Sequence, residues 1–240
     1  MKKFAIAIIA IVMALVIAPA ALAGSLVPAL GAGANGYGTG NYSITTNGDG
    51  SVTLTTGQDG TATPNDYARL AWISPTTGYP ANLTLGNLAG VSASVTLTAG
   101  TDAPFYLLGF TDPSDSFLGT TGGDQILLIE FQPSTISGGS MVADPNATLF
   151  NLYDNTLGVY LLSGQADVNT LAAWIALDPS LSDDALQQIR IGIGLSGGDT
   201  PAESLTVYSA DVSQITPEPS SLWLLGTGLL GLAVVVLRKA

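Results

Sequence analysis

The middle of this chain is divided into short segments by residues that favour turns. Gly, Pro, Asn and Asp recur throughout it, in a protein with 29 glycines and 13 prolines among 240 residues. The segments between them are rich in β-branched and aromatic residues and partly alternate apolar with polar ones, which is typical of strands with one buried face. This punctuation leaves little room for long helices. The pattern therefore favours an all-β fold for the centre of the chain.

About ten segments fit the strand pattern, and two pairs of them form predicted hairpins. One hairpin has Asn47-Gly48-Asp49-Gly50 at its tip, and the other has Asp154-Asn155. The predicted strands are residues 42–46, 51–56, 67–73, 91–98, 105–110, 125–131, 147–153, 156–162, 189–195 and 204–215.

A single region has helical spacing. Leu171, Trp174 and Ile175 recur at three and four residues, behind Asn169 as a candidate N-cap, and Asp178-Pro179 ends the run. Many short strands with one or two short helices predict an antiparallel β-sandwich of jelly-roll type rather than parallel α/β packing.

The N-terminus has the three parts of a signal peptide. A basic start at Lys2 and Lys3 precedes an apolar run, and small residues at Ala21 and Ala23 suit a signal peptidase. We expect this partner to cleave between Ala23 and Gly24, which makes residues 1–23 the signal peptide.

The C-terminus combines a proline-rich motif, an apolar run and a basic stop. Pro217-Glu218-Pro219 precede an expected transmembrane helix at residues 220–237, and Arg238 and Lys239 follow it. The basic pair predicts a cytoplasmic C-terminus, with the domain before the motif outside the inner membrane.

These tail residues closely resemble the PEP-CTERM sorting signal of Gram-negative bacteria. The resemblance covers residues 216–240, about a tenth of the chain. It implies recognition by an exosortase, a membrane-embedded processing enzyme, and delivery to the cell surface or the exopolysaccharide matrix.

Between the two ends we expect a flexible Gly/Ala-rich arm at residues 24–40 and an exported domain at residues 41–215. The turn at residues 85–88, the helical Leu171–Trp174 segment, Ile191-Gly192-Ile193-Gly194 and residues 207–212 occur in an order similar to that of lectin-like jelly rolls. This looser resemblance implies a fold and no particular activity.

The exported part is strongly acidic. Of the 18 acidic residues only Glu218 lies outside residues 24–216, and Arg69 and Arg190 are the only basic residues inside, so the formal charge there is 2 minus 17, or −15. Such a surface repels phosphate backbones and anionic lipids, which argues against nucleic acid as a partner. Cations are the more plausible ligands.

The chain lacks histidine and cysteine. Their absence excludes Ser-His-Asp and Cys-His nucleophiles, histidine acid–base chemistry and ordinary zinc sites. A glycosidase would need two carboxylates about 5 to 9 Å apart, and no residue pair stands out for that role. We therefore expect no enzyme.

Two kinds of binding residue remain as candidates. Asp112, Asp115 and Asp124 lie in predicted loops, where their oxygens could bind calcium, although Asp also suits turns without any metal. Tyr79, in the loop Gly78-Tyr79-Pro80, is the best exposed aromatic candidate for stacking on a sugar, whereas Trp72 and Trp174 fit the core better. No cofactor besides calcium is expected.

Together these features predict an exported, exosortase-processed protein of the surface or extracellular matrix, associated with exopolysaccharide or biofilm. The alternative is a structural or adhesive surface protein without a defined ligand. A glycan-active enzyme and an ice-binding protein are more distant alternatives, the latter because the threonines form no regular Thr-x-Thr ladder along the sequence.

Overall fold

The computed structural model describes residues 20–57, 66–100, 104–111, 125–130, 136–156, 159–160, 168–194 and 203–216. The chain divides into two compact units, one of Met1–Leu22 with Ile215–Ala240 and the other of Ala23–Gln214. The second unit contains most described residues. Within the described residues, none of the helices has the length and hydropathy of a membrane span. The expected transmembrane helix at 220–237 and residues 1–19 of the expected signal peptide lie outside them.

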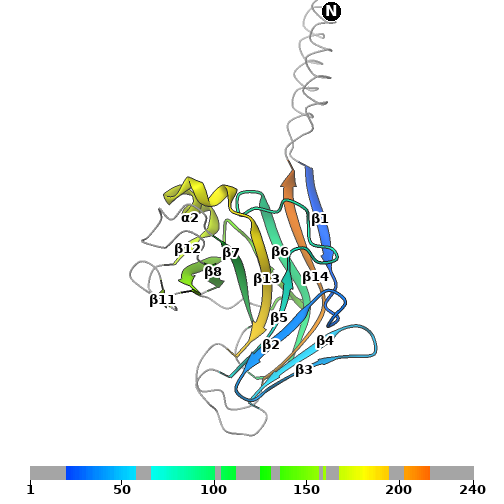
Figure 1. The fold of residues 1–240 in the computed structure, drawn as a ribbon. Helices are drawn as coiled ribbons and strands as arrows, with labels where there is room; N and C mark the ends of the chain where they lie inside the picture. The colour runs from blue at the N-terminus through cyan, green and yellow to red at the C-terminus, as the bar shows by residue number, and fades with distance from the viewer. Residues whose placement is uncertain are drawn as a thin grey trace, which may run out of the picture. The chain divides into compact units, whose positions relative to one another are not determined.

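The described strands form two sheets (Figure 1). The first sheet has the order β3 (Tyr42–Thr46), β4 (Val52–Thr56), β14 (Glu203–Thr216), β6 (Leu88–Ala99) and β9 (Ser140–Ala143), and β1 (Ala20–Leu26) also pairs with β14. The second sheet has the order β11 (Val159–Tyr160), β10 (Leu149–Asp154), β8 (Gln125–Glu130), β7 (Phe105–Thr111), β13 (Leu186–Ile193), β5 (Tyr67–Ile73) and β2 (Asn35–Thr39), and β12 (Asn169–Thr170) also pairs with β10.

Alternate residues of both sheets fill the core between them. On β5 the inward side chains include Leu70 and Trp72, and on β14 they include Leu205 and Val207, all fully buried. Each large side chain of this kind contributes about 1.5–3 kcal/mol through burial. The two-residue period of the sequence thus becomes a sandwich with one shared apolar layer.

The chain passes repeatedly from one sheet to the other. It leaves the first sheet after β4, returns to it with β6, β9 and β14, and supplies β5, β7, β8, β10 and β13 to the second. As a result strands distant in sequence become neighbours, such as β4 beside β14 and β5 beside β13, and these pairs are antiparallel. The predicted antiparallel, jelly-roll-like β-sandwich is confirmed.

The helical segment also forms where its spacing predicted it. Helix α2 spans Leu171–Leu177, with Leu171 and Trp174 buried. Its N-cap is Thr170 rather than Asn169, because the Thr170 hydroxyl accepts a hydrogen bond from the Ala173 amide at 3.2 Å. Asn169 instead lies in β12, where it pairs with Phe150 of β10. A 3-10 helix at Pro179–Asp183 follows α2.

The prediction of a flexible arm at residues 24–40 was wrong. Leu26 and Ala34 are buried in the core, and Asn35–Thr39 form β2, which pairs with β5. The Trp72 indole donates to the Val27 carbonyl at 2.8 Å. The segment is poor in large side chains because it packs closely: a Cβ added at Gly33 would lie 2.4 Å from the Val27 carbonyl oxygen. Small residues here permit contact between backbones rather than flexibility.

Candidate functional site

The fold brings the two arginines of the exported part onto one face of the second sheet. Arg69 lies on β5 opposite Gly192 of β13, and Arg190 lies on β13 opposite Ala71 of β5. They are therefore diagonal neighbours across adjacent antiparallel strands. Their strand neighbours Leu70 and Ile191 point into the core, so both arginines lie on the outer face of this sheet.

Two tyrosines flank Arg69. Tyr37 faces it across the pairing of β2 with β5, and Tyr67 precedes it by two residues on β5. The guanidinium carbon of Arg69 lies 5.9 Å from the ring centroid of Tyr37 and 4.9 Å from that of Tyr67. Both distances fit cation–π contacts, which hold the charged group beside the rings.

Arg190 lies deeper than its neighbours. Its side chain is 8% exposed, whereas Tyr37 at the edge of the sheet is 41% exposed. Arg190 donates from Nε at 2.9 Å and from Nη2 to the Oε1 atom of Gln188, two residues earlier on β13. Burial, together with the nearby charge of Arg69, lowers the pKa of Arg190 to about 10. It still carries its charge at neutral pH.

The two positive charges lack an acidic partner in the described part of the chain. No carboxylate there forms an ion pair with Arg69 or Arg190, although the chain holds 18 acidic residues. The Arg69 Nε atom is buried and has no hydrogen-bond acceptor among the described residues. Burial also lowers the pKa of Arg69. We call Tyr37, Tyr67, Arg69, Gln188 and Arg190 the arginine face, which spans β2, β5 and β13 (Figure 1).

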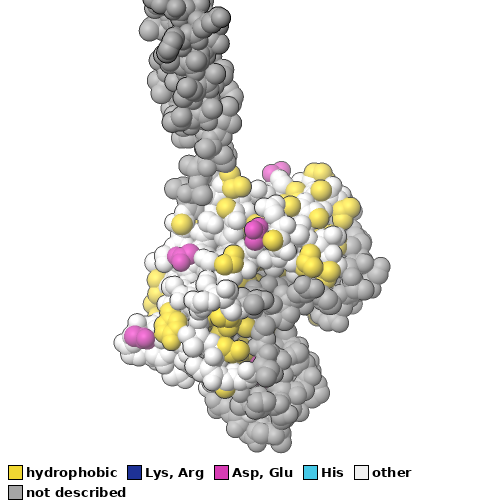
Figure 2. Space-filling view, turned by 180° about the vertical axis from the view of Figure 1, so that it is seen from behind, with side chains coloured by type: hydrophobic (Ala, Val, Ile, Leu, Met, Phe, Trp, Pro, Cys, Tyr) yellow, Lys and Arg dark blue, Asp and Glu magenta, His cyan; other side chains and the backbone are white. Residues whose placement is uncertain are grey.

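Acidic side chains are distributed differently. On the face of the molecule seen in Figure 2, the described side chains include acidic ones at separate positions and no lysine or arginine. The positive charge of the exported part is therefore concentrated at the arginine face, whereas its negative charge is spread out.

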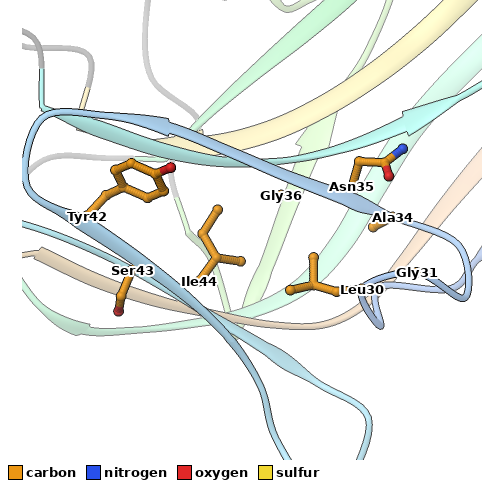
Figure 3. Close-up of a pocket in the computed structure, with 8 residues that line it drawn as sticks. All are labelled: Leu30, Gly31, Ala34, Asn35, Gly36, Tyr42, Ser43 and Ile44. Atoms are coloured by element: carbon orange, nitrogen blue, oxygen red, sulfur yellow. The ribbon is translucent and has the colours of Figure 1, made fainter.

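A pocket of about 590 Å³ lies on the other side of β2. Its lining comes from the turn before β2, from the start of β2 and from β3, and consists of Leu30, Gly31, Ala34, Asn35, Gly36, Tyr42, Ser43 and Ile44. In Figure 3 Leu30, Tyr42 and Ile44 point into the space beneath β2, and Ser43 points away from it. No acid or base lines the pocket except the Tyr42 phenol, so its lining offers no acid–base pair for catalysis.

Tyr79, which the sequence predicts to be exposed, is half-buried. Its hydroxyl donates to the Leu186 carbonyl at 2.7 Å, and its ring packs against the core cluster. Burial raises the pKa of this phenol. The protein itself thus occupies much of the surface that a sugar would need. Trp72 and Trp174 are fully buried, as predicted.

Most of the remaining candidate residues lie outside the described ranges. Asp112, Asp115 and Asp124 lie outside the described residues, as do Pro217, Glu218, Pro219, Arg238 and Lys239. Ala21, Ala23 and Gly24 belong to β1, and their cleavage stays a prediction. Within the described ranges no group of three or more His, Cys, Asp or Glu residues could hold a metal ion.

Hydroxyl side chains form rows across the outer face of the first sheet. The register aligns Thr45, Thr53, Thr206 and Thr96 on the adjacent strands β3, β4, β14 and β6. The hydroxyls of Thr53 and Thr206 are 3.0 Å apart, and those of Ser43 and Thr55 in the next row are 2.7 Å apart. The sequence pattern did not predict this ladder, because its threonines are aligned across four strands and not along one.

Comparison with known proteins identifies the tail. Residues 216–239 match the family model of the PEP-CTERM protein-sorting motif. The chain carries a PEP-CTERM sorting motif. The match confirms the resemblance stated for the tail and includes Pro217, Glu218 and Pro219. No curated protein matches the chain.

Several solved structures resemble the chain distantly. The winged bean acidic lectin, complexed with methyl-α-D-galactose, is 11% identical with a TM-score of 0.39, covering 83% of this chain and 100% of the lectin. A family 11 carbohydrate-binding module from Clostridium thermocellum is 11% identical with a TM-score of 0.34, covering 80% and 95%. The xyloglucanase domain of NopAA from Sinorhizobium fredii is 11% identical with a TM-score of 0.36, covering 81% and 97%. Likenesses this distant carry no argument about ligand or activity.

Proposed function

We propose that this protein is exported, is sorted by an exosortase through its PEP-CTERM motif, and binds polysaccharide at the cell surface or in the extracellular matrix without catalysing a reaction. The match of residues 216–239 to the sorting motif carries the proposal. Export by this route delivers a protein to a place where exopolysaccharide is the abundant ligand. The proposed source is a Gram-negative bacterium.

Each step of the proposed sorting uses a particular segment of this chain. Signal peptidase removes residues 1–23, and the segment at 220–237 holds the protein in the inner membrane with Arg238 and Lys239 on the cytoplasmic side. Pro217 and Pro219 keep the segment before the membrane extended, because proline lacks the amide donor of a helix. Glu218 between them gives the processing enzyme one charge to recognise.

The arginine face supports polysaccharide binding by the sandwich. Tyr37 offers exposed aromatic surface on which a sugar ring could pack, and guanidinium groups beside it are donors for sugar oxygens. These groups lie on strands of the second sheet rather than on loops, so the fold positions them rigidly.

Polysaccharide retention tests the proposal directly. The full-length protein in detergent is passed over immobilised exopolysaccharide from the producing bacterium and over neutral and acidic polysaccharides, each with about 1 mM calcium or with EDTA. We expect retention on at least one matrix and no release of sugar. Retention only with calcium would support the proposed ion at Asp112, Asp115 and Asp124, and sugar release would indicate an enzyme. Absence of retention throughout would favour the structural alternative.

The threonine ladder of the first sheet favours a second candidate, ice binding. Its four aligned threonines present hydroxyls at the regular spacing of adjacent strands, about 4.8 Å. The hydroxyls of Thr53 and Thr206 bond to each other, however, which leaves fewer donors for ordered water. Thermal hysteresis in a solution of the protein would support this candidate over polysaccharide binding.

A further inference from the structure

The arginine face is unusual for its charge environment. Between residues 24 and 216, Arg69 and Arg190 are the only two basic residues, against 17 acidic ones. A structural arginine in such a protein would be expected to pair with one of the many carboxylates. Here the fold places the two like charges on adjacent strands, no carboxylate among the described residues pairs with either, and burial lowers the pKa of both. Such an arrangement costs stability, which points to a role in binding.

Unused donors remain on both side chains. A guanidinium has five N–H donors. Gln188 receives bonds from Nε and Nη2 of Arg190, and the other N–H groups of Arg190 have no acceptor within the described residues. The Arg69 Nε atom is buried without an acceptor there. Among the described residues the site therefore has more donors than acceptors, and an anion with two oxygens would fit that need.

The tyrosines define where such an anion could attach to a larger molecule. Exposure decreases from Tyr37 at the edge of the sheet, at 41%, to Arg190, at 8%. A charged group directed inward would meet the guanidiniums, while the ring that carries it would lie against Tyr37. A sugar with a carboxylate on its ring has this shape, with an apolar ring face and a charged end.

We propose that the arginine face binds the carboxylate of a uronate sugar, so that the ligand is an acidic polysaccharide. This inference rests on the polysaccharide binding proposed above and names the class of ligand. The planar fork of arginine matches a carboxylate with two parallel hydrogen bonds. Tyr67 and Tyr37 hold the Arg69 guanidinium in position for this contact.

The overall negative charge selects among anionic polymers. A net charge of 2 minus 17 over residues 24–216 repels polyanions, and more strongly as their charge density rises. Double-stranded DNA carries about one charge per 1.7 Å, whereas a polysaccharide with occasional uronate units carries far fewer. At an ionic strength of about 0.15 M the repulsion is screened beyond about 8 Å, so the local contact with two arginines decides binding.

A matched pair of ligands tests this inference. A neutral oligosaccharide that carries one galacturonate unit, prepared as the free acid and as its methyl ester, keeps one backbone and differs in a single charge. With the full-length protein in detergent at pH 7, we expect the dissociation constant for the acid to be at least about tenfold lower than for the ester, as for one charge-assisted contact. Arg69→Met and Arg190→Met should each abolish most of this difference.

Two further sets of variants control the measurement. Tyr208→Ala removes a tyrosine from β14 of the first sheet that is 47% exposed, close to the 41% of Tyr37, and it should leave the preference unchanged, whereas Tyr37→Ala should weaken binding of both ligands. The methionine variants should melt at or above the temperature of the parent, because each removes a buried charge that no carboxylate among the described residues pairs. If either unfolds, Arg69→Lys and Arg190→Lys retain the charge, lose the fork and should lose most of the preference.

The outcomes separate this inference from the function on which it rests. Binding of acid and ester with equal affinity would overturn the uronate ligand and leave polysaccharide binding standing. A preference for the acid that survives in all arginine variants would also overturn it, because the carboxylate would then bind elsewhere. Absence of binding to these ligands and to every polysaccharide tested would overturn both proposals.

Discussion

Tyr79 illustrates how a single residue in a loop comes to pack against the core. Its hydroxyl reaches the carbonyl of Leu186, 107 positions away in the sequence, and its ring contacts the core cluster. A loop flanked by Gly78 and Pro80 predicts exposure, because most loops run over the surface. The contact with Leu186 depends on the pairing of distant strands, which local sequence does not encode. By contrast, the burial of Trp72 and Trp174 followed from strand alternation and helical spacing within a few residues.

Replacing Tyr79 by phenylalanine tests its structural role. Tyr79→Phe keeps the ring and removes the hydrogen bond to Leu186, so we expect the free energy of unfolding to fall by about 1 kcal/mol in urea titrations. Polysaccharide retention should not change. The control Tyr208→Phe removes a hydroxyl from a side chain that is 47% exposed, and its effect should stay within about 0.5 kcal/mol. Equal stability of parent and Tyr79→Phe would contradict the role assigned to this hydrogen bond.

Among the secondary-structure elements, sequence patterns predicted the positions of strands better than they predicted which strands pair with each other. Residues 42–46 and 67–73 form strands with the predicted bounds, because alternating residues and clear turn signals define them locally. Strand β2 was missed since three of its five residues are glycine or asparagine, which disfavour strands, and its stability comes from pairing with β5. The arginine face was missed for the same reason: Arg69 and Arg190 meet only through the register of β5 with β13.

Gly33 tests whether the segment before β2 is packed or flexible. A Cβ at Gly33 would lie 2.4 Å from the Val27 carbonyl oxygen, whereas one at Gly48 in the turn between β3 and β4 would meet nothing within 4 Å. We therefore expect Gly33→Ala to lower the free energy of unfolding by about 1–3 kcal/mol, as overpacking does. Gly48→Ala should cause no comparable loss. Equal effects of the two substitutions in thermal or urea unfolding would indicate a loosely packed arm.

For the whole molecule, charge and hydropathy divide the chain by role. The lysines lie at the ends, next to the apolar segments, and the acidic residues lie almost entirely between them. This division was readable from the sequence alone, because targeting signals act as linear segments and need no tertiary structure for recognition. The sorting motif was accordingly the part of the function that sequence predicted most fully, and the family match bears it out. The ligand proposed for the sandwich depends on a face assembled from three strands, which only the fold reveals.

The proposed function requires residues 216–239 to direct the sorting of this protein, and replacing the tripeptide Pro217-Glu218-Pro219 by three alanines is the decisive test of this claim. The apolar segment and its basic stop are unchanged, so membrane insertion should remain intact. A matched control replaces Ser220 and Ser221, the next two residues, by alanine. In the producing bacterium, fractionation and immunoblotting should show the parent and the control processed and released. The tripeptide variant should accumulate at its uncut size in the inner membrane. Processing and release of the tripeptide variant at the rate of the parent would contradict the claim.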